Sequence, residues 1–138
     1  MANDMYPGGG ARNGARAQEE TLCRRSNLLL ALETLANPAT KKYDPALGVA
    51  ITREVSFLRE PWEKNYAPYD PIQIDVVSAA APSFTKAQNS EAKSDKTKQQ
   101  LISLWKKVLC AGTTYGADVL VLSPWGCGAF NNDASHMR

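Results

Sequence analysis

A run of three glycines followed closely by paired carboxylates constrains this chain more than any other feature. The segment PGGGARNGARAQEE begins at Pro7 and ends at Glu20. Consecutive glycines let the backbone adopt positive φ and approach a ligand with no side chain in the way, which leaves N–H groups free to donate to phosphate oxygens. The carboxylates open an apolar helical run. The segment therefore predicts a phosphate-binding turn beside residues suited to acid/base chemistry.

A second glycine motif lies near the other end of the sequence. It reads WGCGAF and runs from Trp125 to Phe130, directly after an apolar run that is typical of a strand. One glycine cluster alone is more often merely a turn. Two clusters, each placed where a strand is expected to end, favour a pair of ligand-binding loops.

Length, composition and charge narrow the class of protein. With 138 residues, 43% of them hydrophobic and 22% charged, the chain fits one soluble globular domain over residues 1–138. The net charge of +2 is close to balanced, and Lys and Arg are scattered among Asp and Glu, so neither DNA nor membrane binding is expected. The apolar stretches are too short to span a bilayer, and the first residues lack the pattern of a signal peptide. We therefore expect a cytoplasmic protein, or a nuclear one in a eukaryote.

The cysteines and the single histidine argue against disulfides and metals. Cys23, Cys110 and Cys127 are an odd number without close spacing, which fits a reducing compartment. The only histidine is His136, and no two cysteines have the spacing of zinc ligands, so no metal is expected. A nucleophilic role for Cys127 would need a histidine base that the sequence does not offer nearby. A small residue filling a tight loop is the favoured interpretation of Cys127.

Apolar periodicity predicts alternating helices and strands. Leucines recur at helical spacing between Gln18 and Leu35, and Asn37-Pro38 would end that helix. Residues 48–58 alternate apolar and polar side chains like a half-buried strand, with Arg53 interrupting the apolar side. The remaining expectations are a loop over 61–70, a more buried strand over 71–77, a surface loop over 83–97, a helix with apolar residues over 101–109 that starts near Ser94 or Asp95 and ends around Gly112, and a strand over 117–122. This order is typical of an α/β layered domain with ligand loops at the carboxyl ends of strands.

Together the two motifs resemble those of the poly(ADP-ribose) glycohydrolases, a branch of the macrodomain superfamily. GGG, a seven-residue spacer and QEE match the family signature and look closest to the bacterial-type members, while WGCGAF is similar to the family's second phosphate loop. The resemblance implies a macrodomain-like mixed sheet layered between helices, with both glycine loops around ADP-ribose. Family members have strands before Ala2-Asn3 and a helix and a strand after Asp133. The chain therefore resembles the central part of the domain, incomplete at both ends.

The resemblance also implies roles for single residues. Glu20 would be the catalytic acid/base, and Glu19 would hydrogen-bond a ribose hydroxyl. Adjacent helical residues point about 100° apart, so two neighbouring carboxylates suit different tasks. Paired glutamates at a helix start more often complement the helix dipole, but the two glycine loops reverse that preference here. The other ligand-binding assignments are Asn3 for a ribose, Gly8, Gly9 and Gly10 with Gly126, Cys127, Gly128 and Ala129 for the diphosphate, Gln18 for orienting Glu20 or the loop, and Phe130 for packing against the distal ribose.

The expected function is hydrolysis of the ribose–ribose glycosidic linkage of poly(ADP-ribose), with release of ADP-ribose and without a cofactor. The substrate would be the polymer or an ADP-ribosylated protein. An alternative is a non-hydrolytic reader that binds ADP-ribose through the same loops but does not position the acid. A generic nucleotide-binding α/β domain is a third possibility, although its P-loop version is excluded because no GKS or GKT follows the glycines.

Overall fold

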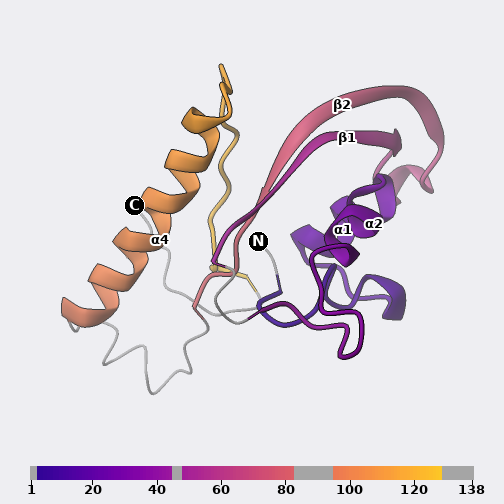
Figure 1. Ribbon diagram of the computed structural model, residues 1–138. Coiled ribbons are helices and arrows are strands. Elements are labelled where there is room, and N and C mark those ends of the chain that lie inside the picture. Colours follow the sequence, from indigo (N-terminus) through magenta and orange to yellow (C-terminus); the bar gives the residue numbers. More distant parts are fainter. Residues whose placement is uncertain (1–2, 45–47, 83–94, 129–138) are drawn as a thin grey trace. The chain divides into compact units, whose positions relative to one another are not determined.

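The structure, a computed structural model, describes residues 3–44, 48–82 and 95–128 (Figure 1). Its contacts separate into two units, Met1–Ala79 and Ala80–Arg138, and each is described here by itself. The chain combines helices with a two-stranded antiparallel sheet, which confirms the α/β class. The elements are η1 (Ala11–Asn13), α1 (Gln18–Arg25), α2 (Leu28–Glu33), β1 (Ala50–Arg59), η2 (Trp62–Lys64), β2 (Pro68–Ser78) and α4 (Asp95–Thr114).

The single helix expected over 18–35 is wrong, because the chain forms two short helices, α1 and α2, separated at Ser26 and Asn27. Ser26 has an extended backbone and forms a β-bridge with Phe57. Asn27 exchanges two hydrogen bonds with Ser56, donating its N–H to the carbonyl at 3.3 Å and accepting the N–H on its side chain at 3.0 Å. Pairing with β1 therefore replaces helical hydrogen bonds at this point, and leucine spacing alone does not register that competition.

The strand expected over 48–58 is confirmed as β1, but its strict alternation is wrong. The pairing with antiparallel β2 shifts between Thr52 and Val55, so Arg53 and Glu54 together face Asp75. Glu54 has a φ of 54° there and donates its N–H to the Asp75 carboxylate at 2.8 Å. This bulge changes which side of the strand is buried. Arg53, which interrupts the apolar pattern in the sequence, marks its position.

The first unit has one core, between the helices and β1. Leu28 and Leu32 of α2 and Val55 of β1 are fully buried, and Cys23 of α1 and Phe57 of β1 pack with them. Figure 1 shows α1 and α2 against one face of the curved β1–β2 ribbon. Because each buried aliphatic side chain stabilises a fold by about 1.5–3 kcal/mol, this cluster holds α1 and its carboxylates in place.

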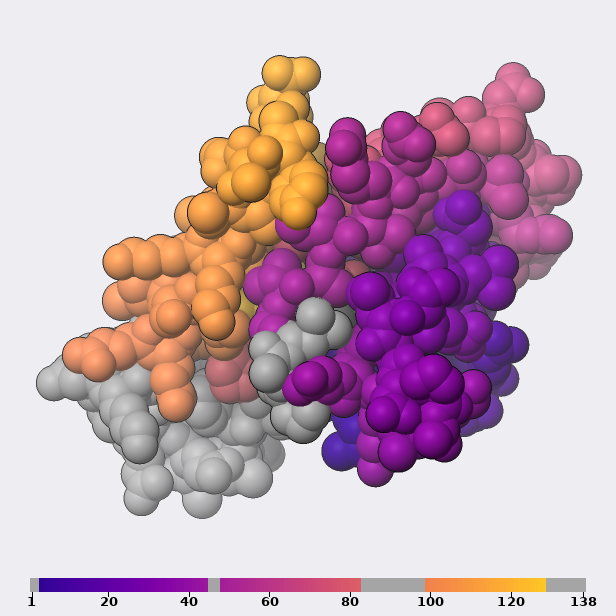
Figure 2. Space-filling model, viewed as in Figure 1, coloured from indigo at the N-terminus to yellow at the C-terminus, as the bar shows by residue number. Residues whose placement is uncertain are grey.

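The strand expected over 71–77 is longer and more exposed than expected. β2 begins at Pro68, inside the loop expected over 61–70, and η2 occupies part of that loop. Ile72 and Ile74 are about half exposed, so the expectation of a more buried strand is wrong. In the part of the chain that the structure describes, β1 is the only strand paired with β2. Most side chains of β2 lie at the surface of the first unit (Figure 2), while Tyr69 and Val76 pack against its core.

The second unit contains α4, which confirms the expected helix and extends it. It starts at Asp95, so the surface loop expected over 83–97 is wrong for its last residues, while residues 83–94 lie outside the described ranges. It ends at Thr114, two residues beyond the expected Gly112, and Gly116 follows with a φ of 73°. Neither α4 nor any other described helix combines the length and apolarity needed to cross a bilayer.

The strand expected over 117–122 is absent from the described structure. The segment is extended without a ladder, and Val119 and Val121 are 78% and 90% exposed. A strand needs a partner for its backbone groups, and the hydrophobic pattern alone does not supply one. Trp105 and Trp125 are packed against each other edge to face, with ring centroids 5.2 Å apart. Trp125 is buried in this unit, and Trp105 is half-buried against it.

Candidate active site

The glycine loop packs tightly against the helices that follow it. Gly8 and Gly9 have φ values of 65° and 49°, in the left-handed region that glycine favours. A Cβ atom on Gly9 would lie 2.5 Å from Oε1 of Glu20 and 3.4 Å from the Cβ of Asn3. On Gly8 it would collide with Leu29 and press on Cys23. Both glycines are therefore required for the loop to cover α1 at all, whatever ligand it binds.

The amides of this loop are already engaged. Gly9 donates its N–H to the carbonyl of Tyr6 at 3.1 Å, and Gly10 donates to Oε1 of Glu20 at 3.2 Å. Ala11 donates to the carbonyl of Gly8 at 2.9 Å. The expectation that these glycines leave their N–H groups free for phosphate is thus wrong for Gly9 and Gly10. The close approach that three glycines permit remains available to a ligand.

Arg24 fixes the far end of the loop to α1. Its Nε donates to the carbonyl of Ala11 at 3.1 Å, and its Nη2 donates to the carbonyl of Ala15. Arg12 also joins the loop to α2 through an ion pair with Glu33 at 2.7 Å. Because this pair is exposed, it contributes little stability, whereas the Arg24 bond to Ala11 is partly shielded from solvent and closes the loop onto its helix. The carboxylates in the first turn of α1 therefore face a fixed backbone.

The structure brings together six of the residues assigned from the sequence, Asn3, Gly8, Gly9, Gly10, Glu19 and Glu20. Glu19 is 4% exposed and Glu20 is 9% exposed. Oε2 of Glu19 accepts the N–H of Asn3 at 2.6 Å, while Oε1 of Glu20 accepts the N–H of Gly10. The two carboxylates therefore bind different segments, as expected for neighbours on a helix. Charged side chains are rarely buried to this degree unless they have a specific task.

Asn3 occupies this site mainly through its backbone. Its side-chain oxygen accepts the N–H groups of Met5 and Tyr6, at 2.8 and 2.7 Å, and closes a turn. We define residues Asn3–Tyr6 as the N-terminal turn. The ribose contact expected of Asn3 is untested, and its side-chain NH₂ is the group still suited to it. Gln18 lies exposed at the start of α1.

Burial raises the pKa of Glu19 to about 7, and the charge of Glu20 adds to this effect. Hydrogen bonds from the backbone of Asn3 and Gly8 act in the opposite direction and are outweighed. Desolvation also raises the pKa of the Cys23 thiol to about 12, with contributions from Glu19 and Glu20. Near neutral pH the site therefore contains a neutral thiol and a Glu19 that exchanges its proton readily.

The shifted pKa of Glu19 predicts a pH dependence of stability. The native state holds this proton up to pH about 7, whereas the unfolded chain releases it near pH 4.5. The stabilising effect of the proton is therefore complete below pH 4.5 and is lost as the pH rises through 7, at about 1.4 kcal/mol per pH unit. Relative to the parent chain, Glu19→Gln should gain about 2–3 kcal/mol of unfolding free energy between pH 5 and pH 7.

Urea unfolding followed by circular dichroism at pH 5, 6, 7 and 8 measures this gain. Glu63→Gln is the matched control, because Glu63 is exposed in η2 and its substitution should leave the pH profile unchanged. Parallel profiles for the parent chain and Glu19→Gln would show that Glu19 titrates normally in the folded state.

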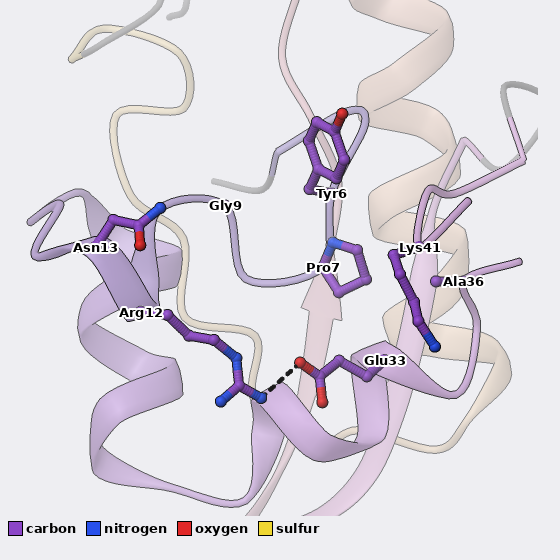
Figure 3. Close-up of a pocket in the computed structure, with 8 residues that line it drawn as sticks. All are labelled: Tyr6, Pro7, Gly9, Arg12, Asn13, Glu33, Ala36 and Lys41. Atoms are coloured by element: carbon purple, nitrogen blue, oxygen red, sulfur yellow. Dashed lines mark hydrogen bonds and ion pairs between the residues drawn. The ribbon is translucent and has the colours of Figure 1, made fainter. Parts of the chain in front are cut away.

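A cavity of about 590 Å³ lies on the outer side of the glycine loop (Figure 3). Gly9 is the only residue assigned from the sequence that lines it. Its other lining residues are Tyr6, Pro7, Arg12, Asn13, Glu33, Ala36 and Lys41. The cavity is thus lined by two cationic side chains, Arg12 and Lys41. Arg12 forms an ion pair with Glu33, which also lines the cavity. No group of three or more His, Cys, Asp or Glu side chains that could hold a metal occurs among the described residues.

The second glycine motif forms a turn in the second unit. Cys127 donates its N–H to the carbonyl of Pro124 at 3.3 Å, and Gly126 has the positive φ, 80°, that such a turn favours in its third residue. The Cys127 thiol contacts the carbonyl of Trp125 at 3.8 Å. This supports the interpretation of Cys127 as a small residue in a tight loop. Ala129 and Phe130 lie outside the described residues, so their assigned roles are untested.

Tyr43 was not expected at the site, and its half-buried side chain interacts electrostatically with Glu19. Its N–H donates to the carbonyl of Met5 in the N-terminal turn at 2.9 Å, and its hydroxyl is buried. Cys23, whose side chain faces the same place, was also missed as a neighbour of the carboxylates. The polar sequence around Tyr43 gives no signal for burial, whereas the spacing of Cys23 from Glu19, one helical turn, could have placed it on the same face.

The family model for the catalytic domain of microbial-type poly(ADP-ribose) glycohydrolases matches residues 1–54. This part of the chain contains the glycine loop, α1, α2 and the buried carboxylates. No curated protein shows detectable sequence similarity to the chain.

Solved structures of bacterial poly(ADP-ribose) glycohydrolases match the whole chain. A mutant from Thermomonospora curvata is 26% identical with a TM-score of 0.81, and the same organism's enzyme bound to the inhibitor ADP-HPD is 29% identical with a TM-score of 0.77. The enzyme from Deinococcus radiodurans with ADP-ribose is 24% identical with a TM-score of 0.64 and shows likeness of fold alone. Each match covers 99% of this chain, but only 52% of the two Thermomonospora chains and 56% of the Deinococcus chain. The resemblance to bacterial-type poly(ADP-ribose) glycohydrolases is therefore confirmed, over about half the length of those proteins.

Proposed function

We propose that this chain carries the catalytic acid of a poly(ADP-ribose) glycohydrolase and contributes to hydrolysis of the ribose–ribose linkage, releasing ADP-ribose. The observation that carries this proposal is the pair of adjacent carboxylates, Glu19 and Glu20, buried under a glycine loop within the segment that matches the family. Solvation favours charged carboxylates at the surface, so two of them beneath one loop indicate chemistry rather than solubility.

Glu20 is the proposed acid/base. Its Oε1 is held by the N–H of Gly10, so Oε2 can deliver a proton to the leaving oxygen as the bond to the anomeric carbon breaks. The sugar then carries oxocarbenium character, and a water molecule attacks it. Glu20 takes the proton from that water and returns to its starting state. Water is consumed, one glycosidic bond is broken, and no cofactor enters the balance.

Glu19 is proposed to orient a ribose hydroxyl and to limit charge in the site. With a pKa of about 7, it is protonated in roughly half of the molecules at neutral pH, so Glu20 does not always face a second negative charge. The other ligand contacts that we propose are those assigned from the sequence, with Gly126, Cys127, Gly128 and Ala129 at the diphosphate and Phe130 at the distal ribose.

Release of ADP-ribose from poly(ADP-ribose), followed by chromatography, tests the proposal. Turnover with retained ADP-ribose binding supports the hydrolase. Binding measured by calorimetry without any turnover would instead indicate the reader, the macrodomain that binds and does not cleave. Among the described residues, no observation favours the reader over the hydrolase.

Hydrolysis is expected to survive chelation of metal ions. The proposed acid is a side chain, and the only histidine in the sequence is His136. Rates measured with and without an excess of EDTA should agree within experimental error. A loss of activity that a divalent cation restores would assign part of the chemistry to a metal.

We further propose that residues 1–138 act within one macrodomain-like domain located in the cytoplasm. The cysteines of the described residues, Cys23, Cys110 and Cys127, are all free, which supports a reducing compartment. The proposed substrates are the polymer and ADP-ribosylated proteins, and no direct contact with DNA is expected at a net charge of +2.

A further inference from the structure

Two buried polar atoms at the site have no hydrogen-bond partner among the described residues. They are Oε1 of Glu19 and the hydroxyl oxygen of Tyr43. A buried polar atom left without a partner costs about 1–3 kcal/mol, and folded proteins satisfy nearly all of them. A carboxylate oxygen accepts hydrogen bonds and a phenol donates one, so each atom is the kind of partner that the other lacks.

Both residues are bonded to the N-terminal turn. Glu19 accepts the N–H of Asn3 at the beginning of the turn, at 2.6 Å. Tyr43 donates its own N–H to the carbonyl of Met5 in the same turn, at 2.9 Å. The side chain of Asn3 accepts two further N–H groups and makes the turn compact. Glu19 and Tyr43 therefore bind one rigid segment of four residues, independently of any electrostatic argument.

The titratable groups around Glu19 and Tyr43 indicate that Tyr43 is the hydrogen-bond donor of the two. Burial, and then the charges of Glu19 and Cys23, raise the pKa of Tyr43 above its usual range, so the phenol keeps its proton at working pH. The other titratable side chains that act on Glu19 or on Tyr43 are Glu20, which is an acceptor when ionised, and Cys23, whose thiol is a weak donor. The backbone groups of Asn3 and Gly8 also interact with Glu19, but among these side chains only Tyr43 offers it a strong hydrogen bond.

We propose that Tyr43 is a positioning residue, whose hydroxyl donates a hydrogen bond to Oε1 of Glu19 across one bridging water molecule and thereby favours the ionised form of the carboxylate. The catalytic consequence of this bond depends on the proposed function, but the bond itself does not. A hydrogen bond to a charged group favours ionisation, and such bonds are strong enough to lower a carboxyl pKa by about one pH unit or more.

The test is the titration of Glu19 in the full chain, observed by ¹³C NMR of the glutamate side-chain carboxyls and assigned with Glu19→Gln. In Tyr43→Phe the midpoint of the Glu19 titration should rise by about one pH unit above that of the parent chain. Tyr6→Phe is the matched control, because Tyr6 belongs to the same turn but is 42% exposed, and its loss should not move the midpoint. Where polymer turnover is measurable, the pH profile of Tyr43→Phe should move in the same direction.

An unchanged midpoint in a folded Tyr43→Phe chain would overturn the proposal, and so would a lower one, since that would make Glu19 the donor. Should Tyr43→Phe fail to fold, a chain with 3-fluorotyrosine in place of tyrosine keeps the test decisive. A more acidic phenol donates more strongly, so the Glu19 midpoint should then fall, and an unchanged midpoint would again overturn the proposal. Because the titration requires no turnover, absence of polymer cleavage would refute the proposed function and leave this result standing.

Discussion

Glu20→Gln is expected to lower the rate of poly(ADP-ribose) hydrolysis about 10²–10⁴-fold, the range that general acid/base assistance typically supplies. The amide keeps the size of the side chain and can still accept the N–H of Gly10, so the loop should stay closed over α1. It has no proton of suitable acidity for the leaving oxygen, which leaves the glycosidic bond without its acid. The measurement is the single-turnover release of ADP-ribose, since this reports the cleavage step and not product release.

Binding separates a lost acid from a lost fold in this variant. ADP-ribose affinity, measured by calorimetry, should stay within a few-fold of the parent chain, because Glu20→Gln leaves both glycine loops unchanged. Glu19→Gln should reduce the rate less, since Glu19 is proposed only to orient a hydroxyl. If Glu20→Gln cleaved the polymer at the rate of the parent chain, Glu20 would not be the catalytic acid, and another group would have to protonate the leaving oxygen. Glu19, with its pKa of about 7, would then be the first alternative.

The sequence predicted helices and strands well where a single local pattern determines them. Helix α4 and strand β1 lie where apolar periodicity indicates them, because a 3.6-residue or two-residue repeat directly reports which face is buried. The misses occur where a long-range partner decides. Ser26 leaves the helix to pair with Phe57, and residues 117–122 stay extended without a ladder. No local pattern contains the information about which distant strand is present to pair.

The site shows the same division between local and distant information. The glycines and the QEE triplet are close in sequence, so their juxtaposition could be predicted, and Gly10 does donate to Glu20. That the amides of Gly9 and Gly10 are used internally could not be predicted, because the acceptors are set by the exact course of the loop. Tyr43 is 24 residues from Glu19 in the sequence and reaches it only through the N-terminal turn. The polar sequence around Tyr43 therefore gives no indication that its hydroxyl is buried.

Gly9→Val is expected to abolish measurable polymer hydrolysis. The new Cβ would lie 2.5 Å from Oε1 of Glu20, a separation that atoms do not tolerate, so either the loop or the carboxylate must move. The φ of 49° adds strain, since a β-branched residue disfavours the left-handed region by about 1–2 kcal/mol or more. Displacing the acid by about 1 Å can cost on the order of a hundredfold in rate, before any loss of ligand affinity is counted.

Gly14→Val separates the collision from the strain. Gly14 has a φ of 83°, yet nothing lies within 4 Å of the position that its Cβ would occupy. Both variants should therefore lose comparable stability from the backbone, but only Gly9→Val should lose hydrolysis and ADP-ribose binding. Thermal unfolding compares the stability of the two variants, polymer turnover compares their hydrolysis, and calorimetry compares their affinity for ADP-ribose. Equal loss of activity in both would mean that general loosening of the loop, and not the contact between Gly9 and Glu20, controls the site.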